Sequence, residues 1–376
     1  MRIGRTIGFL VLALVGAAFV WLAAGSIRAG RRERAAEAAW ETSFGPLGDL
    51  TARFPARPTN ETARALEQSV QNLGIELRPH EELPLEDEPG RPKKTEWDGV
   101  RAPLEKWVDV QAAKAEGLPE PPPAPVASFL AAHAPALDAI EKTLLAGPAP
   151  EWVVDVTRLY ASPLPNLSGQ MQVARALVGR AEGRAAARDA RAEESLRAAF
   201  ALTASLRGRP EIGSQLVSIA ATRLELAAAR RIPIDAAAWR ERLETLDPRA
   251  GMLAAWKRQA WVQYEAEKRL REGRLRTVPL SGRAAGLLRS WRDRVTSAAY
   301  LDAWRAAIEA AAKSPVEDAE TKGLTEAFQG ALVRSGARAV SPEAMPNLVG
   351  SWRRANVLAL EIRKTDEALA ARTPKG

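Results

Sequence analysis

The chain has 376 residues, of which 46% are apolar and 27% are charged, a composition typical of one large globular domain or two smaller ones. It contains no cysteine, which excludes disulfides, thiolate zinc sites, iron–sulfur clusters and cysteine nucleophiles. Only two histidines occur, His80 and His133, and the formal net charge is +8. Most histidine-based metal sites and acid–base devices need more histidines, so we expect no cofactor.

The N-terminus predicts a short tail, residues 1–6, followed by a membrane anchor. Residues 7–25 carry no charge, and as a helix they would span roughly 28 Å, close to the hydrocarbon thickness of a bilayer. A cleavable signal peptide is the alternative, but its apolar core is usually about 7–15 residues long. The small residues around 23–26 also fit a cleavage site poorly, so we expect an uncleaved signal-anchor.

The arginines that flank this span argue for both orientations. The tail carries Arg2 and Arg5, and four arginines follow the span between Arg28 and Arg34. Counted literally, the positive-inside rule keeps the body in the cytoplasm. A short tail with two arginines is nevertheless the ordinary start of a signal-anchor, and on that ground we favour an extracytoplasmic body.

Helices alternate with irregular stretches in an N-terminal part, residues 46–165, that follows a juxtamembrane helix over residues 26–45. Helix formers and apolar spacing predict three helices here, at 60–73, 103–115 and 126–146. The first has Asn60 or Thr59 as its N-cap and Gly74 just beyond its end, and Pro135 should kink the third. Irregular segments are expected at 76–99, which is acidic and rich in proline, at 117–125 and at 147–167.

From residue 166 onward the chain predicts helices almost throughout, in a central core, 166–273, and a C-terminal part, 274–376. Breaks are expected at 182–183, 208–210, 231–233, 247–248, 273–281, 314–315 and 341–347. Helix starts are expected at Asp235, Asp247, Ser281 and Ser314. No fixed repeat is present. The predicted fold is therefore all-α, an irregular antiparallel helical bundle or short α-solenoid-like array behind one N-terminal transmembrane helix.

Five of the eleven tryptophans are followed directly by a basic residue, namely Trp239, Trp256, Trp291, Trp304 and Trp352. Interleaved aromatic and basic side chains can bind single-stranded nucleic acid or sugars by stacking. Each of these tryptophans also lies on the apolar stripe of its helix, with the base about 100° away on the polar flank. We favour core aromatics beside solvated bases, and nucleic acid is not the partner we expect.

Residues 249–305 form a basic segment with 13 Lys/Arg and 5 Asp/Glu, a net charge of +8 that equals that of the whole chain. Solvated helix faces would explain this excess, and so would contact with anionic lipid headgroups or an acidic envelope protein. The candidate contacts with an anionic surface are Arg269, Arg271, Arg274, Arg276, Arg289 and Arg292.

Two pairs of acids lie close to tryptophans, Glu96 with Asp98 and Glu151 with Asp155. Glycosidases use two carboxylates with aromatic platforms, so an enzyme acting on envelope polysaccharide is an alternative function. Nothing in the sequence shows that these acids converge, and no recognised catalytic motif is present, so we expect no enzyme. His133 lies on an apolar stripe and is expected to be a core histidine.

The segment 205–231, SLRGRPEIGSQLVSIAATRLELAAARR, predicts a tight corner followed by a helix. Its apolar stripe is Ile212, Leu216, Ile219, Ala220, Leu224 and Ala227. Ser214, Ser218 and Ala221 form a strip of small residues beside it. Gln215 is expected to be a buried structural polar residue that bonds a backbone carbonyl, for instance in 160–167.

The segments PEWVVDV, PLPNLSGQMQVARALVGRAEGRAAARDA, SLRGRPEIGSQLVSIAATR and AAWRERLETLDP together resemble a loosely defined family of bacterial membrane-anchored proteins over roughly residues 100–260. The resemblance implies one N-terminal span and an all-helical body, and it implies no activity. We therefore expect a single-pass protein of the bacterial inner membrane that has a structural or interaction role in the cell envelope, with the bilayer bound through 7–25.

Overall fold

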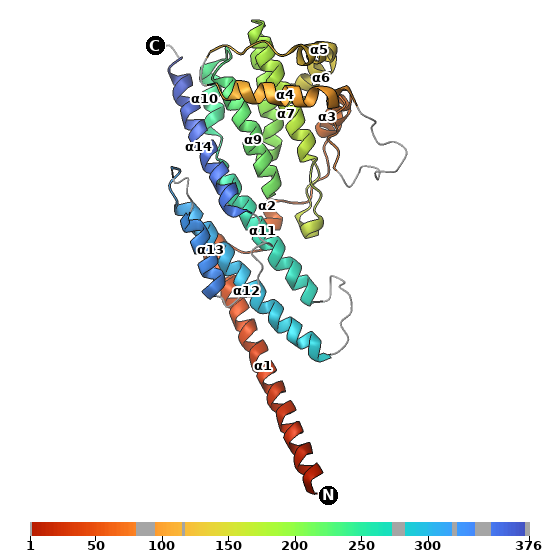
Figure 1. Cartoon of the computed structure of the whole chain (residues 1–376), viewed down its shortest axis with the longest axis vertical. Coiled ribbons are helices and arrows are strands. Elements are labelled where there is room, and N and C mark those ends of the chain that lie inside the picture. Colours follow the sequence, from red (N-terminus) through yellow and green to blue (C-terminus); the bar gives the residue numbers. More distant parts are fainter. Residues whose placement is uncertain are drawn as a thin grey trace. The chain divides into compact units, whose positions relative to one another are not determined.

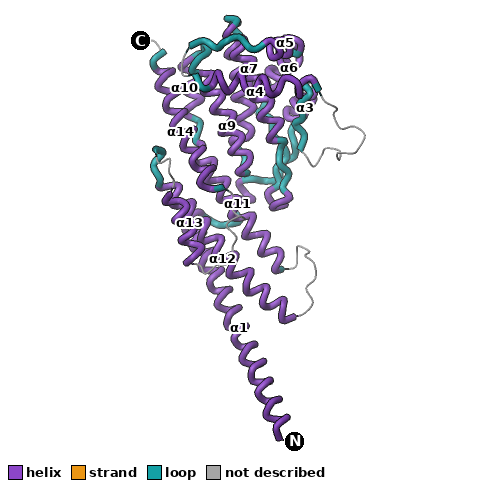
Figure 2. Tube along the Cα trace, viewed as in Figure 1, coloured by secondary structure: helices purple, strands orange, loops and turns teal. Residues whose placement is uncertain are grey.

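The computed structural model describes residues 2–79, 95–114, 117–272, 283–317, 322–334 and 347–372. These residues are mostly α-helical and include no β-strand, and an isolated bridge pairs Arg57 with Val154 (Figure 1, Figure 2). The predicted all-α helical fold is thus confirmed.

The predicted anchor, residues 7–25, falls within α1 (Arg2–Phe44), which continues without a break through the predicted juxtamembrane helix. Most side chains of 7–25 lie outside the described residues. Within the part of the chain that could be searched, no helix is both long enough and apolar enough to cross a bilayer.

The chain forms two compact units that interleave along the sequence. Unit 1 comprises Met1–Arg53, Lys257–Lys313 and Lys322–Asn347, and unit 2 comprises Phe54–Trp256, Ser314–Thr321 and Leu348–Gly376. The division falls inside α11 (Pro248–Arg271), so the units cut across the segments 46–165, 166–273 and 274–376.

Unit 1 contains α1, α2 (Asp49–Arg53), the second part of α11, α12 (Arg283–Lys313) and α13 (Lys322–Arg334). Helix α12 packs against both α1 and α13. Its buried alanines recur every four residues, at Ala299, Ala303, Ala307 and Ala311, which lets a neighbouring helix approach closely.

Unit 2 contains most of the helices and a connected core. Its elements are α3 (Glu61–Gln71), α4 (Glu96–Ala112), α5 (Ala124–Ala132), α6 (Ala134–Ala146), the 3-10 helix Val156–Ala161, α7 (Leu167–Ala186), α8 (Ala192–Arg207), α9 (Ile212–Ala229), α10 (Ala236–Glu244), the start of α11 and α14 (Leu348–Ala370). Helix α9 packs against α4, α7, α8 and α14, and it lies between α14 and α7 in Figure 1.

The interior of α9 is more polar than its sequence pattern predicts. Ser214, Gln215, Ser218, Thr222 and Glu225 are each no more than 3% exposed. Members of the predicted apolar stripe are less buried, since Ile212 and Leu216 are intermediate and Ala220 is exposed. The polar residues can be buried because neighbouring groups form hydrogen bonds with them. Glu225, for example, accepts a hydrogen bond from Thr203 of α8.

Several predicted boundaries were wrong for local reasons. Helix α4 begins at Glu96 rather than near 103, because Thr95 and Asp98 form a capping box in a segment that we expected to be a loop. Helix α7 runs through Gly183 without the expected break. The described residues after Ser314 form a turn rather than a helix start, and Ser314 instead accepts hydrogen bonds from Arg249 and Trp352.

The expected kinked helix 126–146 is two helices, α5 and α6, that meet at His133. His133 is therefore not a core residue within a helix. Its imidazole is 21% exposed, stacks against Phe129 and lies 3.0 Å from Glu96. The predicted start at Ser281 lies outside the described residues.

Candidate anion-binding groove

One face of α9 forms the floor of a groove in unit 2 with a volume of about 1010 Å³. Four residues of α9 and its C-cap line it: Ala220, Arg223, Leu224 and Ala227, followed by Arg230. Because they follow the spacing of a single helical face, the floor extends about 15 Å along the helix axis.

The rest of the lining comes from α14 and the two residues that follow it, from the end of α4 and from α7. Glu361, Lys364 and Ala368 belong to α14, and Ala371 and Arg372 follow it; the remaining residues are Asp109 and Ala112 of α4, Ala113 and Lys114 just beyond its end, and Met171 and Arg175 of α7. Three side chains of the floor, those of Ala220, Leu224 and Ala227, are short or apolar, whereas Arg223 and Arg230 are long and charged. The groove therefore combines apolar and charged side chains.

Positive charge predominates among the residues that line the groove. Six are basic and two are acidic: Lys114, Arg175, Arg223, Arg230, Lys364 and Arg372 against Asp109 and Glu361. Glu361 forms ion pairs with both Arg230, at 3.0 Å, and Lys364, at 3.7 Å. Arg223 is exposed and forms no ion pair with any described residue. Arg175 and Lys114 also pair with carboxylates, Glu105 and Glu120, that do not line the groove. Four of the six cations thus have a carboxylate partner, whereas Arg223 and Arg372 have none among the described residues.

Two successive arginines at the end of α9 tie the floor to α14 and α4. Arg230 donates to Glu361 and Thr365 of α14, at 3.0 and 2.8 Å. Arg231 donates to the Gln111 side chain of α4 at 2.6 Å and to the Gln111 carbonyl at 2.7 Å. In addition, the Arg372 guanidinium bonds the carbonyls at the C-terminal end of α9. These contacts fix the width of the groove without filling it.

Arg231 also forms a buried ion pair with Glu182 of α7, at 3.2 Å between Nη1 and Oε1. Neither side chain is more than 1% exposed. Burial raises the pKa of Glu182 to about 8, although the Arg231 guanidinium opposes the shift. The pair links α7 to the end of α9 behind the groove.

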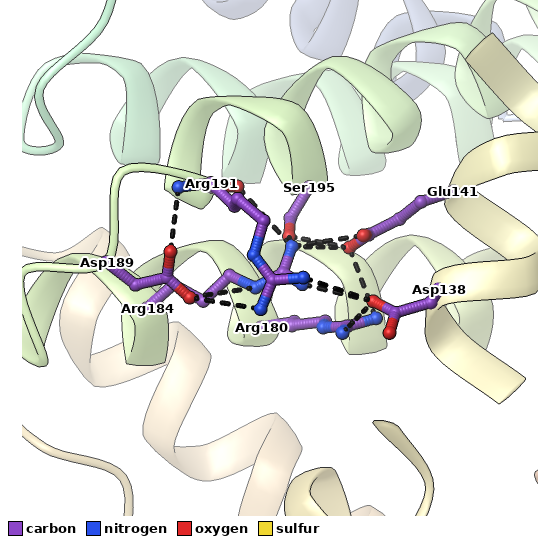
Figure 3. A network of polar contacts seen from close by, with 7 residues as sticks. All are labelled: Asp138, Glu141, Arg180, Arg184, Asp189, Arg191 and Ser195. Carbon is purple, nitrogen blue, oxygen red and sulfur yellow. Dashed lines mark hydrogen bonds and ion pairs between the residues drawn. The ribbon is translucent and has the colours of Figure 1, made fainter. Parts of the chain in front are cut away.

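A second charged cluster joins α6, α7 and α8 (Figure 3). Arg184 donates to Glu141 at 3.0 Å and to Asp138 at 3.2 Å, and Ser195 donates to Glu141 at 2.6 Å. Arg180 also pairs with Asp138. The remaining members, Asp189 and Arg191, pair with each other at 3.5 Å.

This cluster borders a cavity of about 480 Å³, but its charges balance within the protein. Three guanidinium groups face three carboxylates (Figure 3). Glu141, at 3% exposed, has its charge compensated by Arg184 and Arg180. The cluster is therefore a structural network that holds three helices together, in contrast to the groove, where Arg223 has no carboxylate partner among the described residues.

Neither of the two predicted contacts with an anionic surface whose side chains are described lines the groove. Arg269 pairs with Glu265 at 2.9 Å, and Arg271, 9% exposed, pairs with Glu33 and donates to Ser297, all within unit 1. Arg274 and Arg276 lie outside the described residues, as do the side chains of Arg289 and Arg292. Of the six, the two whose side chains are described thus have carboxylate partners inside the protein.

The four acids considered for catalysis have separate structural contacts. Asp98 accepts a hydrogen bond from the Thr95 backbone, and Glu96 faces His133. Glu151 lies 3.6 Å from Arg57, and Asp155 caps the 3-10 helix by accepting from Thr157. None of the four lines either cavity described above.

The tryptophans followed by a base are core residues where their side chains are described. Trp239, Trp256, Trp304 and Trp352 are 0% exposed, while the side chain of Trp291 lies outside the described ones. Their indoles fill the interior, for example where Trp256 and Trp352 lie with ring centroids 5.6 Å apart. They provide no surface for stacking bases or sugars.

Gln215 is 3% exposed, and its hydrogen bonds stabilise the corner between α8 and α9. Its Nε2 donates to the carbonyls of Arg209 at 2.7 Å, Arg207 at 2.9 Å and Leu206 at 3.4 Å. The partners are thus the preceding corner itself and not residues 160–167. Arg209, rather than Gln215, contacts residues 160–167, since it donates a hydrogen bond to the Pro163 carbonyl.

Sequence reasoning missed the groove because it placed Ala220 on the buried stripe of α9, whereas Ala220 is exposed; Leu224 and Ala227 are buried as predicted and still border the groove. No sequence signal identifies which face of a central helix stays uncovered.

The described residues include no cluster of three His, Asp or Glu side chains placed to bind a metal ion.

A comparison of the chain with known protein families, curated proteins and solved structures found no match. The resemblance to a family of bacterial membrane-anchored proteins therefore stays a prediction.

Proposed function

We propose that this chain is a single-pass, membrane-anchored binding protein of the bacterial cell envelope, and that unit 2 binds an anionic partner in the groove along α9. One observation carries the proposal: six cations line the groove against two acids, and Arg223 has no ion-pair partner among the described residues. An exposed cation without a carboxylate partner, set among further bases and beside apolar side chains, is a lining that attracts an anionic partner.

The anchor in this proposal is the uncharged segment 7–25, placed in the inner membrane with the helical body on the extracytoplasmic side. The short basic tail supports this orientation, and the arginines that follow the span oppose it. A C-terminal alkaline phosphatase fusion should be active in this topology. An inactive fusion together with an active cytoplasmic reporter would place the body in the cytoplasm.

The absence of cysteine allows a direct test of the groove, because one introduced thiol can be labelled uniquely. Ala113 lies at the groove and is exposed, so an Ala113→Cys chain can carry an environment-sensitive fluorophore. We expect the labelled full chain, in detergent micelles, to respond saturably to an oligoglutamate peptide. Added salt should weaken the response.

Two variants and one control complete this experiment. The double charge reversal Arg223→Glu with Lys364→Glu should abolish most of the response, since both side chains are exposed and line the groove. Arg197→Glu reverses an exposed charge on α8 outside the groove and should have no effect. An unchanged response in the double variant, or an equal loss in the control, would refute the proposed site.

A further inference from the structure

We infer that the occupant of the groove is an acidic amphipathic α-helix of a partner protein. This inference rests on the proposed function and specifies its ligand. It follows from the shape of the groove, from the distribution of its charges and from the chemistry that its lining lacks.

The shape of the groove fits a helix. The floor residues Ala220 to Arg230 extend about 15 Å along α9, or nearly three helical turns, and those of α14 from Glu361 to Ala368 extend about 10 Å, or nearly two turns. A further helix laid along these faces of α9 and α14 would pack as helices pack on one another.

The floor permits close approach of another helix. Ala112, Ala220, Ala227 and Ala368 line the groove, and alanine side chains leave room for the ridge of a neighbouring helix. Leu224 and Met171 supply larger apolar surface between them. A partner with apolar residues at i, i+3, i+4 and i+7 would cover this strip.

The charges lie at the rim, on both sides of the floor. Arg223 projects from α9, and Lys364 lies one helical turn from Glu361 on α14. Elsewhere in the lining Arg175 pairs with Glu105 at 2.7 Å, and Lys114 pairs with Glu120 at 2.5 Å. Because Arg175 and Lys114 already have carboxylate partners, acidic residues of a bound helix would meet unpaired positive charge at Arg223 and would share the other cations with the acids of this chain.

Other anions fit this lining less well. A compact phosphate group needs donors that converge on one point, whereas these cations are spread over α4, α7, α9 and α14. Single-stranded nucleic acid needs aromatic platforms for its bases, and none of the residues that line the groove is aromatic. The lining thus favours a polypeptide whose charges are distributed along a helix.

The test compares two synthetic peptides of about 18 residues, long enough to cover the groove. One carries an apolar stripe flanked by glutamates, and the other has the same composition in an order that breaks the stripe. Both are titrated against the full chain that carries the fluorophore at Ala113→Cys. We expect the amphipathic peptide to bind at least about tenfold more tightly than its isomer.

A steric variant tests whether binding occurs in the groove. Ala220→Trp places an indole on the exposed part of the floor and should weaken binding of the amphipathic peptide at least about tenfold, without lowering the melting temperature. Ala237→Trp, at an exposed position of α10 outside the groove, is the matched control and should bind as the parent does.

The outcomes separate this inference from the proposed function. Equal binding of the two peptides through the groove, or displacement of both by equimolar tripolyphosphate, would show a general polyanion site and overturn the helix inference alone. If neither peptide binds and oligoglutamate does not bind either, both proposals fail. Undiminished binding by the Ala220→Trp chain would also overturn the inference.

Discussion

Replacement of Gln215 by alanine tests the packing of the α8–α9 corner quantitatively. The change removes an amide that donates to three carbonyls, two of them at 2.9 Å or closer, from a site that is 3% exposed. A buried acceptor left without its donor costs about 1–3 kcal/mol. A neighbouring cavity of about 210 Å³ borders Gln215 and could admit water to part of this site, so we expect a loss of about 2 kcal/mol.

Gly251 supplies a sharper form of the same test. A Cβ at Gly251 would lie 2.5 Å from Oε1 of Gln215, so Gly251→Ala should destabilise the parent chain. In the Gln215→Ala background that clash is absent, and alanine should instead favour α11 by up to about 1 kcal/mol. The sign of the Gly251→Ala effect should therefore reverse between the two backgrounds.

The assay is thermal unfolding of the full chain in detergent, followed by circular dichroism. The Gln215→Ala chain should melt about 4–8 °C below the parent, if about 1 kcal/mol shifts the midpoint by about 2–4 °C. Gln71→Ala, at an exposed position of α3, should leave the midpoint unchanged. An unchanged midpoint for Gln215→Ala, or the same Gly251→Ala effect in both backgrounds, would refute the reasoning.

Three further predictions concern other parts of unit 2. Burial raises the pKa of Glu182 to about 8, so between about pH 4.5 and 8 the folded chain holds a proton on Glu182 that the unfolded chain lacks. This proton's contribution to stability is fully present below pH 4.5 and is lost as the pH rises through 8. Glu182→Gln should flatten the decline in melting temperature from pH 5.5 to 8.5, and a parallel decline would contradict the assignment. Gly169→Ala should lower the yield of folded chain, since its Cβ would lie 2.0 Å from the Glu76 carbonyl oxygen, and a parent-like melting curve would argue against that contact. Arg184→Ala should cost about 3–5 kcal/mol in chemical denaturation, because it removes the main ion-pair partner of buried Glu141, and a loss below about 1 kcal/mol would mean that Arg180 alone suffices.

Features that depend on neighbouring residues were predictable from the sequence. Asn60 caps α3 by accepting from the Ala63 amide at 2.8 Å, and Asp235 caps α10 in the same way. Gly74 adopts a φ of +78° just beyond α3, as expected of a glycine that ends a helix. Such signals lie within four residues of their effect, so the chain itself displays them.

The orientation of α9 could not be predicted in this way. Its apolar stripe suggested one buried face, yet the helix is central and contacts four others. Ser218 and Thr222 are buried among the helices around α9, whereas Ala220 is exposed at the surface. Burial here depends on partners more than a hundred residues away in the chain, such as those on α14.

The groove could not be predicted from the sequence for the same reason. Its lining comes from four helices and the residues that follow them, between residues 109 and 372, and consists mostly of alanines and bases that are unremarkable alone. Attention to the run of bases in 249–305 pointed instead to Arg269 and Arg271, which have partners within unit 1. The candidate site is distinguished by bases from separate parts of the chain that line one groove, rather than by a high density of bases along the chain.

Site-specific photo-cross-linking in the cells that natively produce the protein tests the central claim most directly. A photoreactive amino acid at Ala220 should yield a discrete adduct whose linked segment is an acidic amphipathic helix, and the same group at Ala237 should not. The adduct should disappear when Arg223→Glu and Lys364→Glu are present in the same chain. Equal labelling at Ala220 and Ala237, or an adduct that survives the charge reversal, would contradict a binding role for the groove.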